Sequence, residues 1–259
     1  MSANSLFPSG REAPRGAPWI TAFQAQFKVE LRLMVRQGEN LLVILVLPVL
    51  LLVLFTSARI FPAGSVRPVD FLVPGILTVA VMSTGMVTLG ISTAYQRYYR
   101  VLKRLGGTPL PRSALAAAKA AAVLVVEVAQ VVLLLAIADL GLGWSTTGSI
   151  GLAAVVLFVG AVGFAGIGLA MAGAVRAELT LGGANGLYLL FLILGGVVLP
   201  VSHLPAFVQP LADALPATAL SSSLRAVLEG VAPTAGDLTL LCGWTAAAVL
   251  AAAAWFRWE

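Results

Sequence analysis

The sequence predicts an all-α membrane protein with six transmembrane helices, and three observations lead to that prediction. Hydrophobic residues make up 59% of the 259 residues and charged residues only 10%, whereas a soluble domain carries about 25% charged residues. Apolar runs of about 20 residues, the length that crosses a bilayer core, recur along the chain. Basic residues gather in the segments between alternate runs. Because so few charges cannot cover a water-facing surface, most of this surface is expected to face lipid.

The apolar runs predict spans at residues 41–57, 71–94, 114–138, 150–175, 181–199 and 238–256. An even number of spans puts both ends of the chain on one side of the membrane. Residues 1–18, rich in Ser, Pro and Gly, are expected to form a flexible cytoplasmic tail. Residues 19–259 are expected to form a single transmembrane domain.

The basic residues are distributed unequally between the two sides. Of the 16 Lys and Arg residues, twelve fall on one side: Arg11, Arg15, Lys28, Arg32, Arg36, Arg97, Arg100, Lys103, Arg104, Arg112, Arg176 and Arg257. The other side holds three, Arg59, Arg67 and Arg225, and Lys119 lies inside the start of the third predicted span. Since cytoplasmic loops are enriched in Lys and Arg, we expect both termini in the cytoplasm and a multi-pass protein of the plasma (inner) membrane.

Two segments outside the spans are expected to be helical as well. In residues 19–36, Trp19, Phe23 and Phe27 recur at helical spacing while basic residues fall on another face, a pattern typical of an amphipathic helix lying in the membrane interface. In residues 200–236, prolines separate apolar pieces that are too short to cross the membrane. We expect two short external or re-entrant helices there, near residues 205–215 and 219–229, between the fifth and sixth spans.

The most basic loop follows the second span. Residues 95–107 predict a short two-faced cytoplasmic helix, which Gly106 and Gly107 end, and Pro109 and Pro111 prevent a smooth continuation into the third span. Such a helix is suited to passing a push from a cytoplasmic partner to two membrane helices at once. The alternative is a basic loop that only obeys the positive-inside rule.

Two stretches resemble those of a known family. "RVLKRLGGTPLPRSALAAAK" resembles the loop after the second span in ABC-2 type permeases, the membrane subunits of ATP-binding cassette exporters. "GGVVLPVSHLPAFVQPLADALPATALSSSLRAVLEG" resembles the same family's segment after the fifth span. One departure is that Gln96, Arg97 and Tyr98 stand where relatives often have Glu-Arg-Glu, so two acidic residues that the resemblance implies for contact with the ATPase are replaced in this sequence.

The resemblance implies that residues 95–107 are a coupling helix that docks on a separate ATP-binding subunit. The implied coupling residues are Arg97, Tyr98, Arg100, Leu102, Lys103, Arg104 and Leu105. It also implies ATP-driven export of an amphiphilic small molecule or lipid. The expected partners are the ATP-binding subunit, a second copy or a homologous permease, and membrane lipid, but no nucleic acid.

The chain itself is not expected to be an enzyme. It contains no Gly-x-x-x-x-Gly-Lys-Ser/Thr phosphate loop, the motif whose backbone cradles nucleotide phosphates. ATP and Mg are therefore expected on the partner subunit, with no cofactor on this chain. One histidine, His203, and one cysteine, Cys242, supply neither a catalytic set nor a metal site.

Glu127 is the sharpest polar anomaly, because it falls near the middle of the third predicted span. A charged carboxylate at the bilayer centre costs about 2.5–3.5 kcal/mol on insertion scales. Either it is a polar contact in the translocation path, or it is a neutral carboxyl bonded within the bundle to Gln130 or to a Ser or Thr. Lys119, near the cytoplasmic end of the same span, is expected to extend its amine to the interface.

Other polar residues in the spans have the same two interpretations. The candidates for the translocation path are Glu127, Gln130, Thr84, Thr88 and Asn185. The alternative for the hydroxyl and amide residues is packing between helices. A different function, proton-coupled secondary transport through Glu127, also remains open at this point, although no inverted repeat is evident.

Overall fold

The computed structural model describes residues 18–57, 67–197 and 200–256. The secondary structure of these residues is helical, without strands, and six helical segments are long and apolar enough to cross a membrane. The prediction of an all-α membrane protein with six spans is confirmed. The tail expected at residues 1–18 lies, except for Pro18, outside the described residues.

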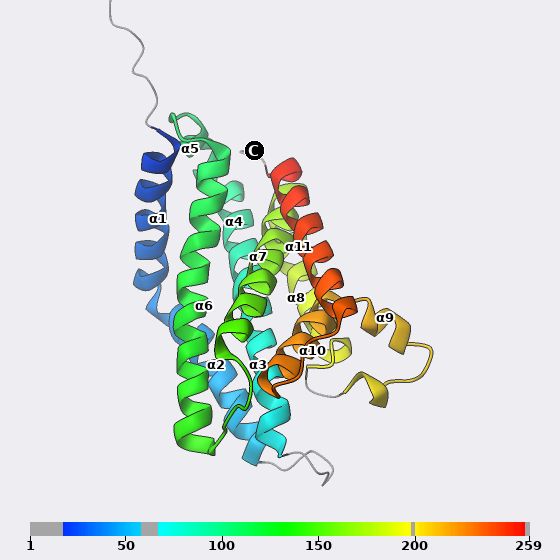
Figure 1. Ribbon diagram of the computed structural model, residues 1–259. Coiled ribbons are helices and arrows are strands. Elements are labelled where there is room, and N and C mark those ends of the chain that lie inside the picture. Colours follow the sequence, from blue (N-terminus) through cyan, green and yellow to red (C-terminus); the bar gives the residue numbers. More distant parts are fainter. Residues whose placement is uncertain (1–17, 58–66, 198–199, 257–259) are drawn as a thin grey trace, which may run out of the picture.

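The second span is one continuous helical segment with a π-helical centre, and the other five are single α-helices. The spanning elements are α2 (Gly38–Ser57), α3 (Pro68–Val81) with η1 (Met82–Thr88) and α4 (Leu89–Tyr98), α6 (Arg112–Leu142), α7 (Ile150–Ala174), α8 (Ala177–Leu194) and α11 (Ala235–Trp255). The remaining elements are α1 (Trp19–Arg36), α5 (Val101–Gly106), the 3₁₀ turn η2 (Val201–His203), α9 (Gln209–Asp213) and α10 (Pro216–Leu228). Figure 1 shows α5, the start of α1 and the end of α11 together at one end of the bundle, which we call the α5 end.

Helix α7 is the centre of the bundle, and glycines let two neighbours approach it closely. On one side, a Cβ at Gly166 would lie 2.9 Å from the backbone carbon of Ala248 in α11. On another, a Cβ at Gly168 would lie 2.7 Å from the carbonyl oxygen of Gly85 in η1. Both contacts require glycine, as is usual where membrane helices pack backbone to backbone. The π-helical segment is thus held against the central helix.

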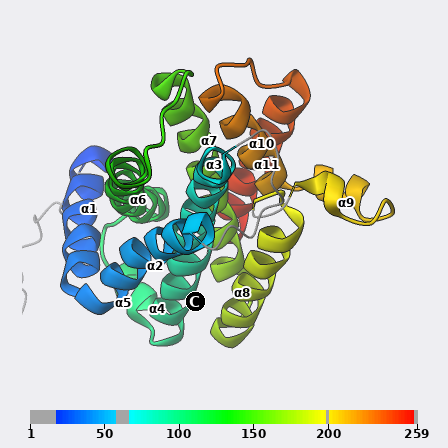
Figure 2. The same cartoon turned by 90° about the horizontal axis from the view of Figure 1, so that it is seen from below.

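Helix α1 lies lengthwise beside the first part of α6, at the edge of the bundle (Figures 1 and 2). It occupies the range expected for the amphipathic helix. One contact that aligns the two helices is a hydrogen bond of 3.0 Å from the Trp19 indole nitrogen to the Ser113 hydroxyl oxygen. Whether α1 lies in the membrane interface stays a prediction.

The fifth span ends earlier than its hydropathy indicates. The prediction of residues 181–199 was wrong at both ends, because α8 begins at Ala177 and ends at Leu194. Gly195 follows as the C-cap, and Gly196 has a φ of 63°, a left-handed conformation that glycine adopts without steric cost. Helix α8 therefore ends before the apolar run of the sequence does.

The segment between α8 and α11 contains the short helices α9 and α10. Helix α10 packs obliquely against α3, α7 and α11, while α9 projects from the bundle (Figure 1). The Arg225 guanidinium of α10 lies 3.9 Å from the centre of the Phe71 ring of α3. Burial lowers the pKa of Arg225, and the nearby Glu229 carboxylate opposes that shift. Arg225 therefore ties α10 to the start of the second span.

Candidate functional site

The candidate coupling segment is two helices and not one. Helix α4 ends at Tyr98 and α5 begins at Val101. Between them Arg100 has a φ of 59°, the only positive φ at a non-glycine residue among those described. A left-handed conformation costs a side-chain-bearing residue about 1–2 kcal/mol. The single helix predicted for residues 95–107 is thus broken at Arg100, which redirects the chain into α5.

The surface of this segment is aromatic and basic. The Tyr98 and Tyr99 side chains are 60% and 65% exposed, and their rings pack edge to face with centroids 5.2 Å apart. Arg100, Lys103 and Arg104 are exposed beside them. We call these five residues the docking surface. Exposed aromatic and arginine side chains are the types enriched at the centres of protein interfaces.

The leucines of the segment face inward instead. Leu102 is 1% exposed and belongs to an apolar cluster with Leu115 of α6, Leu169 of α7 and Phe256 at the end of α11. Leu105 packs against the edge of that cluster. These two residues, which the family resemblance placed among the coupling residues, are therefore the attachment of α5 to the bundle and not part of its surface.

Arg97 also points into the protein. One guanidinium nitrogen donates a hydrogen bond of 2.6 Å to the carbonyl oxygen of Gly173, and another donates to the carbonyl oxygen of Val175. Both carbonyls lie where α7 ends, and basic side chains commonly satisfy the last carbonyls of a helix. Arg97 thus fastens the end of the second span to the turn between α7 and α8.

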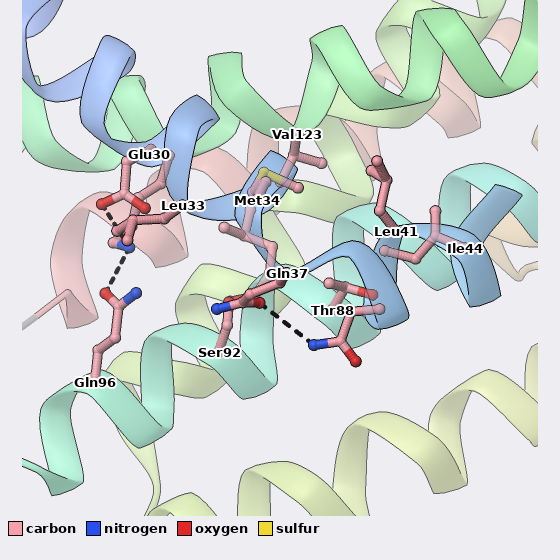
Figure 3. A pocket seen from close by; sticks show the side chains of 13 residues that line it. Glu30, Leu33, Met34, Gln37, Leu41, Ile44, Thr88, Ser92, Gln96 and Val123 are labelled. Atoms are coloured by element: carbon pink, nitrogen blue, oxygen red, sulfur yellow. Dashed lines mark hydrogen bonds and ion pairs between the residues drawn. The ribbon is translucent and has the colours of Figure 1, made fainter.

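A buried ion pair joins α6 to α1, and Figure 3 shows its Glu30 side chain and the neighbouring Gln96 from close by. The Lys119 amine of α6 is 2.9 Å from a carboxylate oxygen of Glu30 in α1, and these side chains are 2% and 9% exposed. The same amine donates a hydrogen bond of 2.6 Å to the Gln96 side-chain oxygen of α4, and the Gln26 amide donates to Glu30 at 2.8 Å. The expectation that Lys119 extends to the interface is wrong, because its partners lie inside the bundle.

Beside this pair is a small polar cavity of about 70 Å³. Polar side chains of Gln37, Asn40, Thr88 and Ser92 share its wall with the ion pair and with apolar residues of α1, α2 and α6 (Figure 3). A cavity needs about 10–15 Å³ of this kind of volume for each water. The space therefore accommodates a few waters but no organic substrate.

Deeper in the bundle, the structure brings three of the predicted path residues to one layer. The Thr84 hydroxyl of η1 donates to the Gln130 side-chain oxygen at 3.1 Å, and the Gln130 amide donates to the carbonyl oxygen of Ile44 in α2 at 2.6 Å. Glu127 is 4% exposed, and neither of its carboxylate oxygens has a hydrogen-bond partner among the described residues. The alternative in which Glu127 bonds to Gln130 or to a Ser or Thr is therefore not found among the described residues.

Glu127 instead faces the backbone of the π-helical segment. A Cβ on Gly85 would lie 3.3 Å from a Glu127 carboxylate oxygen and 3.1 Å from the backbone nitrogen of Ala165. A buried carboxyl group without a partner is costly and is usually neutral or hydrated. π-Helical turns are frequently found at functional sites, and this one adjoins an acid that has no hydrogen-bond partner among the described residues.

The other two predicted path residues lie elsewhere. Thr88 is half-buried at the small cavity, where its hydroxyl donates to the Ser83 carbonyl oxygen at 3.1 Å. Asn185 is exposed on α8, and its amide donates to the Leu181 carbonyl oxygen of its own helix at 2.8 Å. The five candidates thus form no single lining in this conformation, and their part in translocation stays a prediction.

Sequence reasoning missed Glu30 and the break at Arg100. Glu30 is the one acidic residue in a helix with three basic residues, and that is the only signal that singled it out. Its partner lies 89 positions away, and no local pattern links them. Arg100 carries no signal of a break, since neither glycine nor proline occupies the turn.

These features define a multi-pass membrane protein of the permease class, with six spans, a polar layer inside them and a basic, aromatic surface at one end. The family model for ABC-2 type transporters matches residues 21–228, so the chain belongs to the ABC-2 type transporter family. It is a membrane permease of an ABC transporter, and permeases of this family partner with an ATP-binding subunit, often as dimers. No curated protein sequence matches the chain significantly.

Proposed function

We propose that this chain is the permease subunit of an ATP-driven exporter that moves an amphiphilic small molecule or lipid across the plasma membrane. ATP is hydrolysed by a separate nucleotide-binding subunit, which carries the ATP and Mg. Both termini and the α5 end lie in the cytoplasm. The observation that carries the proposal is the docking surface, which is exposed while Leu102 beneath it is buried. The chain itself has no phosphate loop.

Leu102 and Arg97 attach this segment to the bundle, and they explain how a push on the docking surface would reach the spans. Leu102 inserts α5 into the cluster shared by α4, α6, α7 and α11. Arg97 joins the second span to the end of α7. An ATP-binding subunit that shifts α5 would therefore move the cytoplasmic ends of several helices together, because packed helix ends behave as rigid bodies and not as independent segments.

A second copy of the chain, or a homologous permease, completes the transporter in this proposal. Helix α8 supports it, because Gly182 and Gly186 have open space where a Cβ would stand and Asn185 between them is exposed. Small residues allow membrane helices to approach closely, and an amide in lipid gains by bonding across an interface. Asn185 would then line the path between the two copies.

Transport energised by ATP distinguishes this function from proton-coupled transport through Glu127. The chain is co-expressed with the ATPase subunit that co-purifies with it and reconstituted in liposomes, and efflux of a panel of amphiphilic dyes is measured. Efflux that requires ATP and survives a protonophore supports the proposal. Efflux that a protonophore abolishes and that continues without ATP would favour the proton-coupled alternative. Its single supporting observation is that Glu127 has no hydrogen-bond partner within the part of the chain that the structure describes.

A further inference from the structure

A large groove opens between α6 and α11, with α7 as its floor, and nothing in the proposed function uses it. Its volume is about 740 Å³, within the range of about 300–1,000 Å³ that is common for small-molecule sites. We call it the α6–α11 groove. The walls are almost entirely small and apolar, as in Ala116, Ala120, Gly166, Ala252 and Ala253.

The small residues explain why the space is open. Alanines on α6 and α11 face each other across α7, and Gly166 brings α11 down onto α7 without filling the gap between the two outer helices. An empty apolar groove forfeits dispersion contacts along its whole lining. Since its sides offer almost no hydrogen-bonding groups, hydrocarbon suits this groove better than water.

The polar groups of the groove are confined to one end. Arg112 and Ser113, the first residues of α6, line it at the α5 end and are exposed. The Ser113 hydroxyl oxygen accepts the indole hydrogen bond of Trp19 at 3.0 Å. Indoles mark the headgroup level of a membrane, so the positive charge of Arg112 lies at headgroup depth and the apolar walls lie at acyl-chain depth.

A second groove on the other side of α11 provides an internal comparison. It has a volume of about 590 Å³ and is lined by residues of α7, α8 and α11, including Met171, Leu179, Trp244 and Ala247. None of its described lining residues carries a charge. The two grooves are therefore similar in volume and in their apolar lining. They differ because only the α6–α11 groove has a basic residue, Arg112, at the headgroup end.

We propose that the α6–α11 groove binds a phospholipid of the cytoplasmic leaflet, with an acyl chain along the groove and an anionic headgroup beside Arg112. Basic sites between transmembrane helices on the cytoplasmic side suit anionic lipid headgroups, because arginine makes charge-assisted hydrogen bonds to phosphate. The site goes beyond the proposed function, since it requires neither ATP nor a transported substrate. Only the assignment of the leaflet rests on the proposed orientation.

Photo-cross-linking of the full chain tests the site directly. The protein is placed in nanodiscs of phosphatidylcholine that contain a trace of phosphatidylglycerol or phosphatidylcholine with a photoreactive acyl chain, and labelled peptides are identified by mass spectrometry. We expect labels on α6 and on the last turns of α11, with phosphatidylglycerol about fivefold above phosphatidylcholine, the ratio that corresponds to about 1 kcal/mol for one basic residue near the surface.

Three variants separate the parts of the proposal. Arg112→Gln should reduce the phosphatidylglycerol preference to about onefold while phosphatidylcholine labelling stays unchanged, which also shows that the variant is folded. Ala253→Trp should fill the groove and abolish the label there. Ala247→Trp, also an exposed alanine of α11 but in the second groove, is the matched control and should leave the label unchanged.

Several results would overturn the proposal. Equal labelling of wild-type protein by the two lipids would show that Arg112 does not select the anionic headgroup. A preference for phosphatidylglycerol that survives Arg112→Gln would show the same. A label that Ala247→Trp removes and Ala253→Trp does not would place the lipid in the other groove. Cross-links between two protein copies from a photoreactive residue at position 253 would show that a second chain occupies the groove.

Discussion

The buried ion pair between Glu30 and Lys119 makes a quantitative prediction about helix α1. The side chains are 9% and 2% exposed, with 2.9 Å between amine and carboxylate. Removing one partner of a buried pair costs about 3–5 kcal/mol, because the other charge is left buried and unpaired. We therefore expect Lys119→Met to weaken the docking of α1 on α6 by about 3 kcal/mol or more.

Hydrogen–deuterium exchange of the full chain in nanodiscs measures that docking. Each 1.4 kcal/mol is a factor of ten in an equilibrium constant, so peptides within residues 19–36 should exchange about 100-fold faster in Lys119→Met. The double variant Glu30→Met/Lys119→Met leaves no charge behind. Its exchange should return close to the wild-type rate, since apolar replacement of both partners is often neutral.

Lys28→Met is the control, because Lys28 lies on the exposed face of the same helix and surface substitutions usually stay within about 0.5 kcal/mol. The reasoning fails if Lys119→Met exchanges no faster than Lys28→Met. It also fails if the double variant is as fast as the single one, since the acceleration would then come from lost packing and not from an uncompensated charge.

Three further predictions concern the coupling segment and the core. Leu102→Ala should lower the free energy of unfolding by about 2–5 kcal/mol, as for other buried leucines. Arg104→Ala should leave the melting temperature unchanged and reduce co-purification of the ATPase. Equal melting temperatures of the two variants would contradict the conclusion that Leu102 attaches α5 to the bundle while Arg104 belongs to the docking surface. Gly168→Ala should destabilise the folded protein, because its Cβ would meet two carbonyl oxygens of η1 at 2.7 and 2.8 Å, and Gly182→Ala, where the space is open, should not alter melting of the isolated protomer. Glu127→Gln, a neutral replacement of similar shape, should preserve melting and ATP-dependent efflux; a folded variant without efflux would show that the acid itself serves transport.

The spans were predictable because a bilayer imposes a length and a composition on each helix. The length and apolar composition of each of the six runs identify it as a span, and the charged residues between the runs mark the helix ends. The end of the fifth span was misplaced because hydropathy continues through Leu199, while Gly195 and Gly196 stop the helix first. Local backbone preference outweighed the apolar pattern there.

The candidate site was only partly predictable. Composition and spacing identified the basic segment, and the family resemblance supplied its role, but neither indicated which side chains face outward. Leu102 and Arg97 turn inward because partners from α6 and α7, distant in the sequence, surround them. Similarly, Lys119 was expected at the membrane surface because Glu30 is visible only once α1 lies beside α6.

The central claim is that the docking surface binds an ATP-hydrolysing partner in the cytoplasm, and cross-linking in cells tests it most directly. A photoreactive amino acid replaces Tyr98, which is 60% exposed, and Leu140, which is 86% exposed near the other end of the bundle, serves as the control position. We expect a cross-link from position 98 to a protein that contains a phosphate loop, and none from position 140. Labelling of position 98 from outside the cell, or cross-links from it to lipid alone, would contradict the account.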